Sequence, residues 1–314
     1  MSADIRDVVM VGAGPSALTA AVYTTREDID TVLYERATIG GLAATTDMID
    51  NYPGFPEGIP GMELAEKFEK QAARFGADID FGDVSSIKKD GDYVTVEVDG
   101  QPVKARSVLI ATGSDYRKLG IPGEAEFFGR GCHYCATCDG AFYKGKRMVV
   151  VGGGNSAIQE AIFLTRYASH IDLLVRSSIK ASEVLQDELE KHVAGGVITV
   201  HLETKPLEVL ADNGRTTGIK VDGPDGVYAI ETDAIFIFIG LVPNTAFLAG
   251  SDVTLDETGL IETDNHFATS MPGVFASGDV RSGAVRQVVS AAGEGAAVAL
   301  SLREYIDDMR RRGL

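Results

Sequence analysis

Short runs of apolar residues alternate with amphipathic segments along this chain. The first run covers residues 8–11 and ends at Gly12, residues 15–26 then place apolar side chains on one face, and residues 31–34 form the next run. Short apolar runs bounded by turn residues are typical of buried strands, whereas a period of 3.6 residues indicates a helix. The pattern therefore predicts a strand–turn–helix–strand unit.

A second unit of the same kind begins 140 residues after the first. Residues 148–151 repeat the first run, residues 155–167 the helix and residues 171–175 the second strand. Alternating apolar and polar residues follow the two units at 82–110 and at 218–238, and they predict antiparallel hairpins. This internal repeat, about one domain long, predicts two similar α/β folds rather than a solenoid.

The last part of the chain, from Phe247 onward, lacks a glycine-rich turn of the kind that opens each unit. A helical period over residues 285–309 predicts a final helix. We therefore expect this part to complete one of the two domains.

Composition and charge narrow the class of protein. With 314 residues, of which 45% are hydrophobic, the chain can bury one large core or two medium ones. Its net charge of −17 argues against a nucleic-acid partner, because a phosphate backbone would be repelled. The longest apolar run, residues 234–239, is too short for a membrane span, and the N-terminus has no secretory pattern, so we expect a cytoplasmic protein.

The first glycine-rich turn, at residues 12–17, has the features of a dinucleotide site. Its glycines permit a tight turn and close backbone approach to a pyrophosphate, and the following helix presents its N-terminus to the phosphates. Glu35 lies 23 positions after Gly12, where a carboxylate accepts hydrogen bonds from ribose hydroxyls. This combination favours FAD; the alternative is a tight turn in an ordinary α/β domain.

The second glycine-rich turn, at residues 152–157, differs at the ribose position. The residue 23 positions after Gly152 is Val175, and Arg176 follows it. Loss of the carboxylate removes a group that repels a 2′-phosphate, and a nearby arginine can bind one. The second turn therefore favours NADP.

The cysteines Cys132, Cys135 and Cys138 are grouped within seven residues. A Cys-x-x-Cys pair is redox-active or half of a metal site, and at a helix N-terminus its thiolate is stabilised. Asp139 follows the pair and could move a proton during thiol exchange. Iron–sulfur proteins also use this spacing, but a fourth cysteine is lacking and His133 has no paired motif, so we expect no metal and a packed thiol at Cys132.

Residues 132–143 closely resemble the active-site signature of low-molecular-weight thioredoxin reductases, which are FAD-dependent pyridine nucleotide-disulfide oxidoreductases. The resemblance covers essentially the whole chain in order. It includes residues 52–56 (Tyr-Pro-Gly-Phe-Pro), 111–113 (Ala-Thr-Gly), 240–245, 277–280 (Ser-Gly-Asp-Val) and 286–287 (Arg-Gln).

The resemblance implies a homodimer with an α/β fold of two Rossmann-like, three-layer ββα domains, the second inserted into the first. An FAD-binding domain would comprise residues 1–116 and 247–314. An NAD(P)-binding domain, residues 117–246, would carry the cysteine pair. Electrons would pass from NADPH through FAD and the Cys135–Cys138 disulfide to thioredoxin.

The resemblance also implies roles for individual residues. Cys138 would lie nearer the flavin, Cys135 would attack the substrate disulfide, and Asp139 would be the acid–base group. The residues that would hold FAD are Gly12, Gly14, Ala17, Glu35, Gly41, Asn51, Ala111, Thr112, Gly113, Gly278, Asp279, Arg286 and Gln287. Those that would hold NADP are Gly152, Gly154, Asn155, Ser156, Ala157, Arg176 and Lys180.

One departure from the family leaves the electron donor open. The family shows His-Arg-Arg followed shortly by another Arg where this chain has Val175-Arg176-Ser177-Ser178-Ile179-Lys180. NADPH, NADH, or a donor such as reduced ferredoxin or a deazaflavin all remain alternatives. A small-molecule dithiol oxidase and a flavin-binding redox sensor are the further functions to distinguish.

Overall fold

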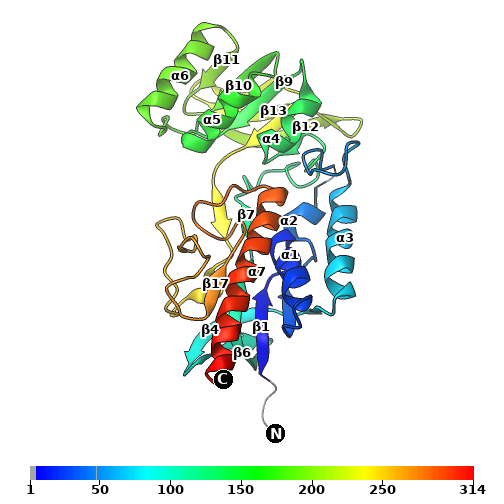
Figure 1. The fold of residues 1–314 in the computed structure, drawn as a ribbon. Helices are drawn as coiled ribbons and strands as arrows, with labels where there is room; N and C mark the ends of the chain where they lie inside the picture. The colour runs from blue at the N-terminus through cyan, green and yellow to red at the C-terminus, as the bar shows by residue number, and fades with distance from the viewer. Residues whose placement is uncertain (1–4, 47) are drawn as a thin grey trace. The chain divides into compact units, whose positions relative to one another are not determined.

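The computed structural model describes residues 5–46 and 48–314, and these divide into two compact units, Met1–Asp115 with Val242–Leu314 and Tyr116–Leu241 (Figure 1). The first unit ends at Asp115 and resumes at Val242, whereas the sequence led us to expect residues 116 and 247. Asn244 belongs to the first unit, where its backbone N–H donates to Gly113 O at 3.0 Å and its side chain donates to Thr112 O at 3.1 Å. The chain passes between the units at β7 (Ser114–Tyr116) and β16 (Leu241–Pro243), which pair with each other.

The first unit contains a mixed sheet with helices packed on it. Its strands are β1 (Arg6–Val11), β2 (Thr31–Glu35), β3 (Asp78–Phe81), β4 (Val84–Asp90), β5 (Tyr93–Val98), β6 (Gln101–Ile110) and β17 (Val274–Ala276). Its helices are α1 (Pro15–Thr25), α2 (Gly41–Ala44), α3 (Gly61–Arg74), the 3₁₀ turn η2 (Ala246–Leu248) and α7 (Val288–Arg311). The strand order is β3-β2-β1-β6-β5-β4, with β17 parallel to β6.

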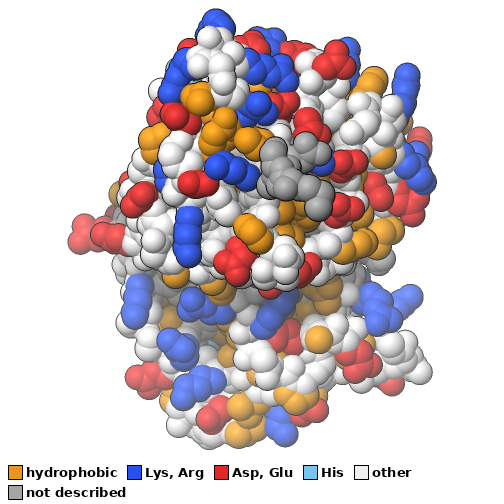
Figure 2. Space-filling model, turned by 90° about the horizontal axis from the view of Figure 1, so that it is seen from below, with side chains coloured by type: hydrophobic (Ala, Val, Ile, Leu, Met, Phe, Trp, Pro, Cys, Tyr) orange, Lys and Arg blue, Asp and Glu red, His pale blue; other side chains and the backbone are white. Residues whose placement is uncertain are grey.

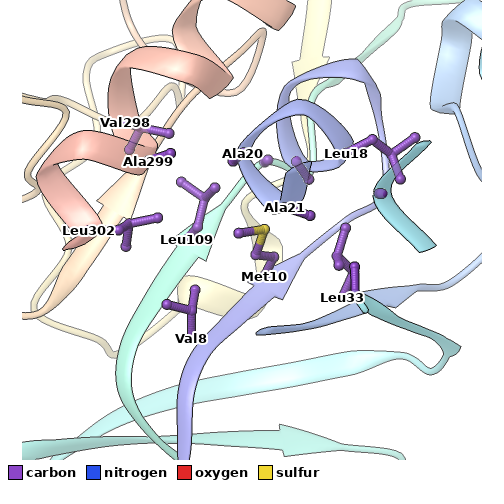
Figure 3. Close-up of a cluster of buried hydrophobic side chains, with 14 of the residues drawn as sticks. Val8, Met10, Leu18, Ala20, Ala21, Leu33, Leu109, Val298, Ala299 and Leu302 are labelled. Carbon is purple, nitrogen blue, oxygen red and sulfur yellow. The ribbon is translucent and has the colours of Figure 1, made fainter. Parts of the chain in front are cut away.

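One buried cluster of the first unit lies between this sheet and the helix pair α1 and α7. Met10, Leu18, Leu109 and Leu302, which come from β1, α1, β6 and α7, belong to one cluster of buried side chains and have no exposed surface (Figure 3). Burying a leucine side chain of this kind contributes about 1.5–3 kcal/mol. Gly295 lets the helices approach, because a Cβ there would collide with the backbone carbonyl of Ser16 in α1. The predicted strand–turn–helix–strand unit is confirmed.

The final helix begins later than the pattern predicts. The sequence predicts a start at residue 285, but Arg286 has a φ of +62° and α7 begins at Val288. Gln287 is the N-cap, and its side chain and that of Ser290 form a reciprocal capping box. The predicted start was three residues too early, because Val285 is an exposed apolar residue in the loop before the helix.

The second unit contains a parallel sheet and a separate antiparallel one. Its strands are β8 (Cys132–His133), β9 (Arg147–Val151), β10 (His170–Leu174), β11 (Ile198–His201), β12 (Lys205–Asp212), β13 (Arg215–Gly223), β14 (Gly226–Glu231) and β15 (Ala234–Ile237). Its helices are α4 (Ala136–Asp139), the 3₁₀ turn η1 (Gly140–Tyr143), α5 (Asn155–Leu164) and α6 (Glu183–Ala194). The parallel sheet has the order β11-β10-β9-β15-β8, and the antiparallel sheet the order β12-β13-β14.

The hairpin predicted over 218–238 covers only part of that range. Strands β13 and β14 form it, whereas β15 pairs in parallel with β9. The chain changes sheets at Thr232, whose buried hydroxyl donates to Ala234 O at 2.8 Å. In the first unit, β6 pairs with β5 in the hairpin and continues without a break to pair in parallel with β1. The hairpin and the parallel strands therefore form a single sheet.

Charged side chains of both signs are interspersed on the face of the molecule in Figure 2. Several arginines near the C-terminus have acidic partners: Arg310 lies 2.7 Å from Asp7, and Arg312 lies 2.8 Å from Asp92. Within residues 5–46 and 48–314, every helix is too short or too polar to cross a membrane.

Candidate active site

Cys135 and Cys138 form a disulfide at the start of a short helix. Their Cα atoms are 5.3 Å apart, and both residues are half-buried. Cys135 has extended backbone and is the N-cap of α4, and its Sγ accepts a hydrogen bond of 3.2 Å from the N–H of Cys138. An N–H that points at this sulfur stabilises a thiolate when the disulfide is reduced. The cysteine pair therefore lies at a helix N-terminus, the position at which a thiolate is stabilised.

Asp139, the last residue of α4, belongs to a chain of polar groups. Its Oδ2 lies 3.1 Å from Nδ1 of His133, and the Nε2 of the same ring lies 2.8 Å from the hydroxyl of Tyr143. From the sequence, His133 was considered only as a metal ligand, and no role was predicted for Tyr143. The signal available was their position, since both lie inside the cysteine-containing segment.

Cys132 lies on the buried strand β8 and has no exposed surface. Burial, reinforced by the nearby charge of Glu124, raises the pKa of this thiol to about 12. It therefore stays protonated at neutral pH and is a poor nucleophile. Across the described part of the chain, no group of three or more His, Cys, Asp or Glu side chains is arranged to hold a metal ion.

The two glycines of the first glycine turn, Gly12 and Gly14, serve different purposes. Gly12 has a φ of +97°, and a Cβ there would lie 2.7 Å from the carbonyl oxygen of Ala111. Gly14 has an ordinary φ of −79°, and a Cβ there would meet no protein atom within 4 Å. Gly12 is therefore needed by the fold, whereas the bare backbone at Gly14 leaves room for a phosphate. This open turn at the N-terminus of α1 fits the pyrophosphate of a dinucleotide.

Glu35 organises the adjoining pocket. Its Oε2 accepts a hydrogen bond of 2.8 Å from Ala13 N–H, and its Oε1 accepts one of 2.9 Å from Ala37 N–H. A carboxylate has about four acceptor positions, so ribose hydroxyls can still bind. The pocket is lined by Val11, Gly12, Tyr34, Glu35, Arg36, Gly82, Asp83, Val84, Thr112, Asn244 and Phe247. Gly12, Glu35 and Thr112 were predicted site residues, whereas Arg36, Asp83 and Asn244 were not. Arg36 directly follows Glu35, and Asp83 and Asn244 come from other segments of the chain.

Further predicted FAD residues lie beside the first turn. A Cβ on Gly41 would lie 3.8 Å from Gly14 Cα, so these two glycines face each other. Ala17 is fully buried in α1, and Ala111 N–H donates to Val11 O at 2.9 Å. Gly113, the third residue of the Ala-Thr-Gly segment, has a φ of +65°.

The remaining predicted FAD residues come from later segments of the first unit. Asn51 donates a hydrogen bond of 3.0 Å to the side chain of Gln287. Gly278 has a φ of +75°, and its N–H donates to Glu294 at 2.7 Å. Burial raises the pKa of Asp279 to about 6; the charge of Arg286 opposes this and that of Glu294 adds to it.

The second glycine turn repeats the division seen in the first. Gly152 has a φ of +145°, and a Cβ there would collide with the carbonyl of Phe238, whereas one on Gly154 would meet nothing within 4 Å. Ala157 is buried and Ser156 is exposed. Asn155 uses its Oδ1 to accept a hydrogen bond of 2.8 Å from the backbone N–H of Ser182, the N-cap of α6.

The loop after β10 carries exposed positive charge against this turn. Its Lys180 N–H donates to Gly153 O at 2.6 Å, which holds the loop on the turn. The side chains of Arg176, Ser177 and Lys180 are exposed. Two cationic side chains and a hydroxyl are therefore available to an anionic group bound near the turn.

These features define a class. Two open glycine turns at helix N-termini, together with a disulfide that caps a helix beside a carboxylate, are the parts of a nucleotide-dependent disulfide oxidoreductase.

Comparison with known proteins agrees with this class. Residues 6–295 match the family model described as pyridine nucleotide-disulphide oxidoreductase. The thioredoxin reductase of Listeria innocua is 40% identical over 311 residues, 98% of this chain and 95% of the relative, and that of Bacillus subtilis is 39% identical over 309 residues, 98% and 96%. The crystal structure of thioredoxin reductase from Streptococcus pyogenes, at 34% identity, has a TM-score of 0.92 and covers 98% of this chain and 100% of that one. The chain belongs to the pyridine nucleotide-disulphide oxidoreductase family, as an FAD-dependent flavoprotein with a redox-active disulfide.

Proposed function

We propose that this chain is a thioredoxin-disulfide reductase that takes electrons from NADPH through FAD and the Cys135–Cys138 disulfide to thioredoxin. The observation that carries the proposal is the disulfide itself, which caps α4 next to Asp139 in a chain with two glycine turns. The full-length similarity to thioredoxin reductases supports thioredoxin as the substrate. A homodimer is proposed as the working assembly on the sequence resemblance alone.

FAD would be held by the first unit. Gly12 and Gly14 leave space for its pyrophosphate, Glu35 offers acceptors to its ribose, and the segments around Asn51 and Asp279 supply further polar groups. When bound, FAD accepts a hydride from a nicotinamide and supplies two electrons for reduction of a disulfide.

The protein's own residues carry the exchange with the substrate. Once the pair is reduced, Cys135 gives its proton to solvent and attacks one sulfur of the substrate disulfide as a thiolate, and the first substrate sulfur takes up a proton from solvent as it leaves. Cys138 then gives its proton to Asp139 and attacks Cys135 Sγ, and Asp139 passes this proton to the second substrate sulfur, which leaves as a thiol. The enzyme dithiol becomes a disulfide and the substrate disulfide becomes two thiols, so electrons and protons balance.

Two electron donors are candidates, NADPH and NADH. Arg176 and Lys180 favour NADPH, because each offers a charge-assisted contact to a 2′-phosphate. Ser177 favours NADH as the second candidate, because a hydroxyl stands where the family has an arginine. One such contact is worth about 1.5–3 kcal/mol, or roughly ten- to a hundredfold in affinity.

An anaerobic titration of the purified flavoprotein tests the proposal. We expect NADPH at micromolar concentration to bleach the flavin, and added oxidised thioredoxin to restore its colour. Bleaching by NADH alone would change the donor and keep the enzyme. Flavin that is bleached only by dithionite would require another donor, and reduced protein that fails to reduce thioredoxin would overturn the substrate.

A further inference from the structure

We propose that His133 is a positioning residue for disulfide exchange, which orients the Asp139 carboxyl and joins it to the Tyr143 hydroxyl. The proposal rests on the function proposed above, because it assumes that Asp139 exchanges protons with the cysteine pair. It adds a residue to the site that lies outside the Cys-x-x-Cys-Asp segment.

The ring of His133 is held from several sides. Its side chain is only 4% exposed, and it lies on β8, one strand along from β15. The ring stacks on Phe236 with centroids 5.2 Å apart and 28° between the planes, and it meets the edge of Tyr143 at 5.2 Å. A ring packed in this way cannot turn over without breaking these contacts.

Both ring nitrogens of His133 have a polar partner, Asp139 at 3.1 Å and Tyr143 at 2.8 Å. An ionised carboxylate only accepts hydrogen bonds, so Nδ1 carries a proton and donates to Asp139. The neutral ring then has a lone pair on Nε2, which accepts from the Tyr143 hydroxyl. This tautomer satisfies both hydrogen bonds, from His133 to Asp139 and from Tyr143 to His133, and the direction of the Asp139 carboxyl is thereby fixed.

The surroundings keep the Tyr143 hydroxyl at the end of this hydrogen-bond network protonated. Burial raises the pKa of Tyr143 to about 12, and the nearby charges of Asp139 and Asp233 act in the same direction. Tyr143 therefore remains a donor at neutral pH, and Cys132 on the same strand remains a neutral thiol. Phe236, from β15, contributes no charge.

The decisive experiment compares half-reactions of the holoenzyme. His133→Leu fills a similar volume but has no polar atom, whereas His133→Asn keeps an N–H near the position of Nδ1. We expect His133→Leu to slow disulfide reduction about tenfold and to shift its pH profile, with flavin reduction by the nicotinamide unchanged. We expect His133→Asn to recover most of the lost rate. Tyr143→Phe, which keeps the ring contacts, should shift the pH profile in the same sense.

A double-mutant comparison separates positioning from packing. In an Asp139→Asn background, His133→Leu should have no further effect on disulfide reduction, because it acts through the carboxyl. Independent effects in the two backgrounds, or an unchanged pH profile in both His133→Leu and Tyr143→Phe, would overturn the proposal. The readout uses oxidised thioredoxin and, in parallel, a small aromatic disulfide. A wild-type enzyme that reduces neither would instead contradict the proposed function.

Discussion

The hydroxyls of Ser16 and Ser277 form a hydrogen bond of 2.6 Å between segments 261 residues apart in the sequence. Both side chains are buried. Ser16 lies in the first turn of α1, within the glycine-rich segment 12–17, and Ser277 precedes Gly278 and Asp279. The bond therefore joins the two parts of the first unit at the place where the predicted FAD residues meet.

This hydrogen bond makes a prediction about stability. Ser16→Ala or Ser277→Ala alone leaves a buried hydroxyl without its partner and should cost about 1–3 kcal/mol of unfolding free energy. The double variant should cost less than the sum, because no orphaned hydroxyl remains. Urea unfolding of the flavin-free protein measures all three. Strict additivity would show that the two hydroxyls are not coupled.

Gly14 is the position at which flavin binding can be weakened without disturbing the fold. Its φ suits alanine, and an added Cβ meets no protein atom within 4 Å, so Gly14→Ala should fold normally. Its methyl group would occupy the space left for the pyrophosphate, and flavin affinity should fall about tenfold or more. The flavin-to-protein ratio after gel filtration measures this.

Gly293→Ala serves as the matched control for this prediction. Gly293 is exposed in α7 and also has open space at its Cβ, so alanine should leave flavin binding unchanged and stabilise the helix by about 0.5–1 kcal/mol. Equal flavin loss in both variants would contradict the role of Gly14.

Much of the fold could be predicted because its signals are local. The runs that became β1 and β9 are followed at once by glycines, and the apolar period of α1 is short and continuous. Helix α3 was not predicted, although Leu64, Phe68 and Ala72 have helical spacing. Helix α6 has a weaker hydrophobic pattern, because Leu189 is buried while most of its surface is polar.

The site was predictable only in part, because its remaining contacts are long-range. The disulfide pair and the glycines were identified from motifs a few residues long. The pairing of Asn51 with Gln287 joins residues that no local pattern relates. The contact of His133 with Asp139 spans only six residues, but it depends on a turn between a strand and a helix that the sequence does not specify.

Cys138→Ser should separate the two halves of the reaction. Without the second sulfur the disulfide cannot form, so thioredoxin reduction should fall by about a thousandfold or more while the flavin still binds and is still reduced by its donor. Rapid-mixing absorbance follows flavin reduction, and thioredoxin turnover follows the rest. Cys132→Ala is the control, because that buried thiol is neutral and should leave turnover within about twofold.

Ser177→Arg should strengthen the preference for NADPH. The side chain is exposed on the loop beside the second glycine turn, where an arginine can add a charge-assisted contact to a 2′-phosphate. We expect about a tenfold or greater gain in affinity for NADPH with little change for NADH. Flavin-reduction titrations with both donors measure the ratio. Ser177→Gln adds a polar side chain that is shorter and uncharged, and an equal gain in that variant would contradict the electrostatic reason.

Asp279 predicts a pH dependence of stability with a definite sign. Burial raises its pKa from the ordinary 3.8 to about 6, so the folded chain binds this proton more tightly than the unfolded chain does. The ionised carboxylate therefore destabilises the fold as the pH rises from about 4 to above 6, and the effect is absent below that window. In the flavin-free protein, Asp279→Asn should be more stable than wild type at pH 7.5, by on the order of 2 kcal/mol, and this difference should be mostly lost at pH 4. Unfolding measured across this range gives the difference, and curves that stay parallel would show that the carboxyl does not titrate as its burial requires.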